Sequence, residues 1–191
     1  MERLNFSMQA FDEFNLTGWR GRLEDFGHMT VQRQKGASGA FRGFAELFGE
    51  RLPHTEYTGI GSGYPSLSDG KLSVGGQDVS LRHNSLGLNR HARALKLSYQ
   101  DRSYTYTATG YAKPSQLVRD GVQITVGPGS SESPRGRGVR TGLAVGTVDA
   151  VDLALALIFE VVDTSTLTLG GALVSAPFTL MRPHPRNGGY E

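Results

Sequence analysis

Hydrophobic and polar residues alternate along most of the chain from 57 to 148, the pattern of strands that bury one face. The alternation predicts one hairpin over 72–81, with Gly75 and Gly76 at its turn, and a second over 95–108 that turns at residues 100–102. Further strands are expected over 122–126 and 139–145. We expect these strands to form an antiparallel sheet.

Two N-terminal segments have a different pattern. Residues 1–25 mix aromatic and acidic side chains, and we expect them to be irregular or partly helical. A short strand is expected over 27–33. In 38–52, Phe41, Phe44 and Phe48 recur at helical spacing before Pro53, which predicts a helix that either covers the domain or docks a protein partner.

The segment 149–163 predicts a helix that is apolar around most of its circumference. Such a helix must be surrounded by protein, and it is too short to span a bilayer, which needs about 20 residues. Acids at both of its ends need explanation. Asp149 and Asp152 fit a capping role at the first turn. Glu160 and Asp163 oppose the helix dipole and call for a basic partner or water, and we expect a buried pair with an arginine. The core of the helix is assigned to Leu153, Leu155, Leu157 and Phe159.

These elements predict a mainly β (α+β) fold, an antiparallel β-barrel or strongly curved sheet wrapped round one central hydrophobic helix near the C-terminus. We expect a single domain over 1–191, with an N-terminal irregular or helical region (1–56) packed on a β-rich body (57–181) and a tail (182–191). One or two more strands are expected after the helix, around 167–180. The chain has 191 residues, 26 glycines and no cysteine. Its start lacks a secretory pattern, so we expect a cytoplasmic protein.

Charge is uneven along the chain although the net charge is only +2. Between 71 and 119, eight Lys and Arg residues stand against two Asp residues. This predicts a basic face that binds an anionic ligand, which we assign to Arg82, Arg90, Arg93 and Lys96. The alternative is that these side chains keep strand edges soluble.

Familiar catalytic motifs are absent from the sequence: it has no phosphate-binding P-loop, no H-E-x-x-H and no G-x-S-x-G. The glycine-rich run 59–63 lacks a following helix and predicts a turn. The five histidines show no metal-ligand spacing. We therefore expect no catalytic residues, no metal and no cofactor.

Three stretches of the sequence together resemble the tubby-like fold. They are Gly-Leu-Asn-Arg-His-Ala-Arg-Ala-Leu (87–95), Tyr-Thr-Tyr (104–106) and the apolar helix that begins at Asp149. The superfamily contains tubby C-terminal domains, phospholipid scramblases and LURP-one-related proteins. The resemblance covers 57–163 and implies a closed antiparallel barrel around one hydrophobic helix. It also implies phosphoinositide or membrane binding, but no lipid-binding residue of tubby can be matched to a position here.

Three classes of function stay open. The first, which we prefer, is a non-catalytic binding or scaffold protein that recognises an anionic membrane surface or a small phosphorylated ligand. The second is a protein-interaction subunit of a larger assembly, using the Phe41, Phe44 and Phe48 helix or the C-terminal strand segment. The third is an enzyme with an unrecognised site. Nucleic acid is not an expected partner.

Overall fold

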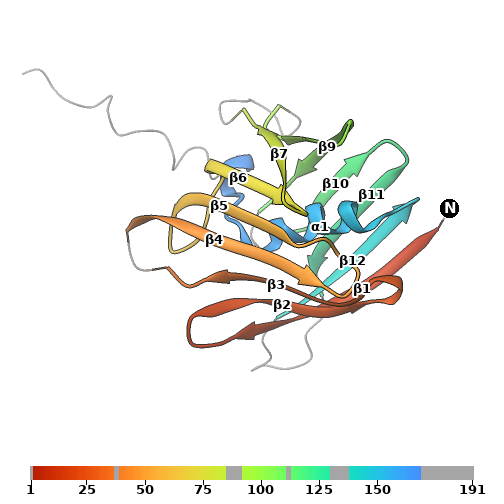
Figure 1. The fold of residues 1–191 in the computed structure, drawn as a ribbon, viewed down its shortest axis with the longest axis horizontal. Coiled ribbons are helices and arrows are strands. Elements are labelled where there is room, and N and C mark those ends of the chain that lie inside the picture. The colour runs from red at the N-terminus through yellow and green to blue at the C-terminus, as the bar shows by residue number, and fades with distance from the viewer. Residues whose placement is uncertain (1, 37–38, 85–91, 111–112, 130–137, 169–191) are drawn as a thin grey trace, which may run out of the picture.

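The computed structural model describes residues 2–36, 39–84, 92–110, 113–129 and 138–168, whose strands close into one antiparallel barrel (Figure 1). Each strand pairs with its neighbours in the chain, and the first pairs with the last to close the barrel. The strands are β1 (Arg3–Asp12), β2 (Leu16–Leu23), β3 (Gly27–Gln34), β4 (Ala40–Gly49), β5 (Thr55–Ser62), β6 (Ser68–Val74), β7 (Gln77–Arg82), β8 (Leu95–Tyr99), β9 (Arg102–Thr107), β10 (Ser115–Arg119), β11 (Val122–Pro128) and β12 (Val139–Gly146).

The hairpins expected from the alternation are confirmed. Gly75 and Gly76 have φ of 57° and 77° between β6 and β7, the left-handed backbone that a two-residue hairpin turn requires. Gln100 and Asp101 adopt the same conformation between β8 and β9. Apart from the β1–β12 pair that closes it, the mainly β barrel is therefore built from strands that are consecutive in the chain.

The N-terminal expectations over 1–25 and 38–52 are wrong, because both segments form barrel strands. In β1, Leu4, Phe6 and Met8 are buried at alternate positions. The segment predicted as a helix is mostly β4, where Gly43, Ala45 and Leu47 face the interior. Its aromatic spacing suits a helix, but a period of two runs through the same residues, and pairing with β3 and β5 favours the strand.

The central helix α1 (Ala150–Ile158) continues as a 3-10 turn over Phe159–Val161 and is enclosed by the barrel (Figure 1). Leu153, Leu155 and Leu157 have no exposed surface, and Phe159 is 2% exposed. The expected capping role of the acids is confirmed. The Asp149 side chain accepts from the Val151 and Asp152 amides, and Asp152 accepts from the Asp149 amide.

The segment after β5 folds back and packs closely against that strand. Gly59 and Gly61 lie within β5 rather than in the expected turn. A Cβ on Gly59 would lie 2.0 Å from the Ser66 carbonyl oxygen, and one on Gly61 would lie 1.9 Å from that of Tyr64. Only glycine lets residues 64–66 pack this closely on the strand.

The chain leaves the helix beside this folded-back segment. The Asp163 amide donates to the Pro65 carbonyl oxygen at 2.8 Å. A last 3-10 turn covers Ser165–Leu167. Most of the strand region expected at 167–180, and the tail at 182–191, lie outside the described residues. Within the described part of the chain, no helix has the length and apolar character needed to cross a membrane.

Candidate functional site

A cavity of about 380 Å³ opens at the end of the barrel where the central helix ends. Its volume falls in the range of small-ligand pockets, about 300–1,000 Å³. Its walls come from strands β3, β9, β10 and β12, from the segment before β6 and from the helix end. The residues used below are Arg33, Tyr64, Tyr106, Lys113, Ser115, Arg140, Phe159, Glu160 and Asp163.

A buried carboxyl group forms the polar part of this pocket. The Glu160 side chain is 4% exposed, and its Oε2 lies 3.3 Å from Arg140 Nε. The Ser115 hydroxyl donates to Glu160 Oε1 at 2.8 Å. The expected buried pair with an arginine is therefore confirmed for Glu160, and the arginine is Arg140. Asp163 is exposed instead.

Aromatic rings form the apolar part beside this cluster. The Tyr106 and Phe159 ring centroids are 4.7 Å apart, and both rings are buried. At the opening, the Arg33 guanidinium lies over the Tyr64 ring, 3.4 Å from its centroid. Lys113 lies exposed at the rim. The pocket thus combines an apolar wall with cations at two depths.

Burial controls the protonation of the pocket's inner groups. Burial raises the pKa of Glu160, although Arg140 and the Ser115 hydroxyl oppose this change. Burial also raises the pKa of the Tyr106 phenol, which stays neutral at ordinary pH. The cluster can therefore pair with a ligand anion through Arg140, and it can take up a proton at Glu160.

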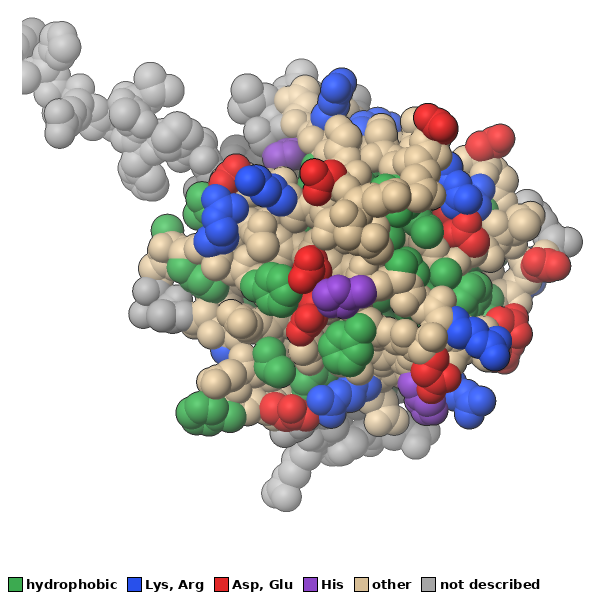
Figure 2. Space-filling model, in the orientation of Figure 1, with side chains coloured by type: hydrophobic (Ala, Val, Ile, Leu, Met, Phe, Trp, Pro, Cys, Tyr) green, Lys and Arg blue, Asp and Glu red, His purple; other side chains and the backbone are tan. Residues whose placement is uncertain are grey.

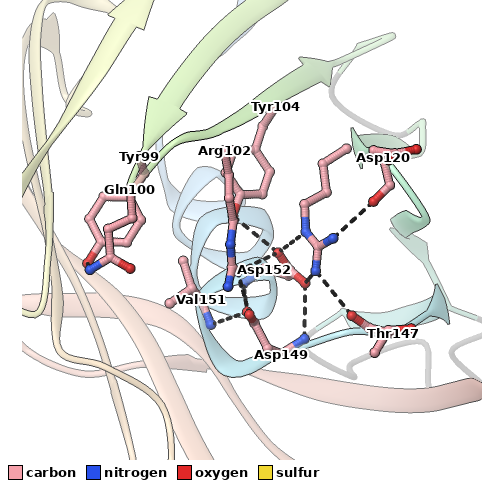
Figure 3. A network of polar contacts seen from close by, with 10 residues as sticks. Tyr99, Gln100, Arg102, Tyr104, Asp120, Thr147, Asp149, Val151 and Asp152 are labelled. Atoms are coloured by element: carbon pink, nitrogen blue, oxygen red, sulfur yellow. Dashed lines mark hydrogen bonds and ion pairs between the residues drawn. The ribbon is translucent and has the colours of Figure 1, made fainter.

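A second polar cluster closes the opposite end of the barrel, at the first turn of the helix (Figure 3). Asp152, with no exposed surface, receives two hydrogen bonds of 2.7 Å from Arg119 and one of 3.2 Å from Tyr104. Arg102 pairs with Asp149 beside them. Burial opposes ionisation of Asp149, but bonds from the Asp152 amide and from Arg102 outweigh it and lower its pKa. These contacts satisfy the acids internally, so we assign the cluster a structural role.

Of the three described residues predicted as a basic face, the structure brings two together. Arg82 and Lys96 are register partners on β7 and β8, and both are exposed. Arg93 is only 9% exposed, and its guanidinium donates to the Thr168 carbonyl oxygen at 2.7 Å. Arg90 lies outside the described residues. Anion binding at Arg82 and Lys96 stays a prediction.

The aromatic residues expected on a docking helix lie on a strand. In β4, Phe44 and Phe48 alternate with the buried positions and so face outward, and Phe48 is 42% exposed. Phe41 has the inward phase of Gly43. On the side of the molecule where β4 and β5 lie, hydrophobic side chains surround acidic groups and a histidine (Figure 2). His54 and Glu46 approach to 3.4 Å on this side.

Three pocket residues were not predicted from the sequence: Arg33, Ser115 and Arg140. Each stands in the inward phase of its strand: Arg33 follows Met29 and Val31, and Arg140 precedes Gly142 and Ala144. A polar side chain in phase with buried positions is a signal that could have marked them.

Comparisons with known protein families, curated proteins and solved structures found no match to this chain. Within the residues that the structure describes, no three His, Cys, Asp or Glu side chains are grouped so that they could hold a metal ion. The barrel and its pocket are therefore the features that bear on function.

Proposed function

We propose that the protein is a binding module of tubby-like type whose barrel-end pocket holds a small ligand with an oxyanion group and a short apolar body. The observation that carries the proposal is the pocket of about 380 Å³ that joins Arg140 and Arg33 to the Tyr106 and Phe159 rings. Arginine suits phosphate-type oxyanions because its planar fork matches them, and the rings suit an apolar group. The barrel around one hydrophobic helix supports the tubby-like assignment.

Phosphate chemistry is shared by free phosphorylated compounds and by lipid headgroups, so the test has two arms. Calorimetry should show binding of phenyl phosphate but not of phenol, which lacks the anion. In the second arm, the protein should be mixed with vesicles of phosphatidylcholine with and without phosphatidylserine and then sedimented. Sedimentation only with the anionic vesicles would identify a headgroup ligand, whereas phenyl phosphate binding alone would favour a free ligand.

Variants locate the site. Arg33→Gln with Lys113→Gln should weaken phenyl phosphate binding about tenfold, because two partly screened cations contribute up to about 1 kcal/mol each. The matched control is Arg82→Gln with Lys96→Gln, which removes two cations from the outer face of β7 and β8 and should leave affinity unchanged. The reverse result would move the site to that outer face. Absence of binding to both probes would refute the proposal.

Docking of a protein partner on the outer face of β4 is a second candidate. It is favoured by the 42% exposure of Phe48 beside the outward-facing Phe44. Sedimentation equilibrium of the wild type and of Phe48→Ser tests it for self-association. A concentration-dependent complex that the substitution abolishes would support docking, and a monomer in both proteins would exclude a second copy as the partner.

A further inference from the structure

We propose that Glu160 is a specificity-determining residue of the pocket, because it competes with the ligand's oxyanion for Arg140 and so couples anion binding to the uptake of one proton. This inference rests on the proposed function. It adds a selection rule: the pocket accepts an anion readily only when its own internal carboxylate has been neutralised.

The competition follows from the geometry of the buried pair. Glu160 Oε2 is 3.3 Å from Arg140 Nε, and the Arg140 side chain is 16% exposed. A ligand oxyanion that reaches Arg140 through the pocket must therefore approach a carboxylate that is already there. Two anions that contact the same guanidinium repel each other strongly in a buried site, because water screens them poorly. Protonation of Glu160 removes the repulsion.

The remaining groups around Glu160 do not supply this proton. The Ser115 hydroxyl on β10 contacts Glu160, and the Tyr106 phenol on β9 stays neutral because burial raises its pKa. Arg and Lys side chains keep their positive charge from pH 5 to 8. The charged and titratable groups that line the pocket from the packed elements are Arg33 on β3, Tyr64 before β6, Lys113 before β10, Arg140 on β12 and Asp163 after the helix.

Asp163 provides a natural comparison with Glu160. It also lines the pocket, but it is exposed, and its Oδ1 accepts a hydrogen bond of 2.9 Å from the Ser165 amide. Water reaches this exposed carboxylate. In contrast, burial raises the pKa of Glu160. The buried acid is thus the one that an arriving anion can drive to the neutral form.

Proton linkage gives the size of the effect. A bound anion raises the pKa of Glu160 further, so affinity increases as pH falls between the pKa values of the bound and the free protein. The increase is at most tenfold per pH unit for one proton. A probe that does not itself titrate is needed, and phenyl sulfate meets this condition between pH 5 and 8.

The test is calorimetry of phenyl sulfate binding from pH 5 to 8. Wild-type affinity should rise at least tenfold from pH 8 to pH 5. Glu160→Gln keeps a side chain of the same size without the charge, so it should bind at pH 8 about as tightly as the wild type at pH 5, with no pH dependence. The matched control Asp163→Asn should keep the wild-type pH dependence. Ser115→Ala removes a donor to the carboxylate and should move the rise in affinity to higher pH.

Each outcome separates the inference from the proposed function. Binding that is independent of pH in the wild type, or a pH dependence that persists in Glu160→Gln, would overturn the role of Glu160 and leave the binding function standing. No binding by either protein at any pH would refute both. If Glu160→Gln fails to fold, wild-type calorimetry in buffers of different ionisation enthalpy decides. Proton uptake that accompanies anion binding is expected within pH 5 to 8, and zero uptake at every pH would contradict the coupling.

Discussion

Replacement of Asp152 by Asn should destabilise the protein strongly although it changes almost no volume. The Asp152 carboxylate has no exposed surface and accepts bonds from Arg119, Tyr104 and the Asp149 amide. The substitution removes the charge that Arg119 faces and leaves that cation partly buried beside a neutral group. Figure 3 shows how these groups converge on the first turn of the helix.

The expected loss can be estimated from the burial of the two partners. Breaking a buried ion pair from one side costs roughly 3–5 kcal/mol. The Arg119 side chain keeps 19% exposure, so water relieves part of the penalty and we take the lower end, about 3 kcal/mol. That is a large share of a typical unfolding free energy of about 5–15 kcal/mol.

Urea unfolding followed by circular dichroism measures this loss. Arg102→Gln is the control at the same cluster. The side chains of Arg102 and of its partner Asp149 are both about 40% exposed, so this substitution should cost less than about 1 kcal/mol of unfolding free energy. The double variant Asp152→Asn with Arg119→Gln should be more stable than Asp152→Asn alone, since it leaves no unpaired charge. A loss of unfolding free energy below about 1 kcal/mol in Asp152→Asn would refute the structural role assigned to this cluster.

Further expected outcomes concern the core, the pocket wall and pH. Leu157→Ala should cost about 2–5 kcal/mol in urea unfolding, whereas Leu143→Ala on the outer face of β12 should stay within about 0.5 kcal/mol; similar losses at both sites would contradict the enclosed helix. Gly59→Ala should displace residues 64–66 and reduce phenyl phosphate binding, while Gly138→Ala, whose Cβ would meet Trp19 at 3.7 Å, should bind normally; intact binding in Gly59→Ala would show that this wall is dispensable. Because folding lowers the pKa of Asp149, this acid stabilises the fold at pH values above its unfolded-state pKa, and the contribution is lost as pH falls through its folded-state pKa. Because folding raises the pKa of Glu160, stability decreases as pH rises above 4.5, the ordinary pKa of this acid. Urea unfolding across pH should therefore show that Glu160→Gln loses less stability than the wild type above pH 4.5, and equal slopes would contradict the raised pKa.

The barrel and its helix could be predicted from the sequence because both follow from local patterns. Buried and exposed residues alternate in strands such as β8 and β9. The apolar segment after Asp149 is stable only when it is buried in a core. The helix predicted for the segment that forms β4 was wrong because the spacing of its aromatic residues fits both a helix and a strand. Only its pairing with β3 and β5 decides between them, and that information is not local.

The pocket was harder to foresee because it forms from distant strands. Ser115 on β10, Arg140 on β12 and Glu160 after the helix are separated in the sequence, and packing of the helix end inside the sheet brings them together. The excess of positive charge over 71–119 indicated Arg93 instead, but the Arg93 guanidinium donates a hydrogen bond to the Thr168 carbonyl oxygen. The charge density along a sequence does not report which charged side chains the fold buries.

The most direct test of the central claim is an amide chemical-shift map of the ¹⁵N-labelled protein during titration with phenyl phosphate. We predict that the shifts concentrate on residues that line the barrel-end pocket, with Ser115, Arg140 and Glu160 among the largest, and that Arg82 and Lys96 stay unchanged. Shifts centred on Arg82 and Lys96, or no saturable shifts at all, would contradict the assignment of this pocket as the binding site.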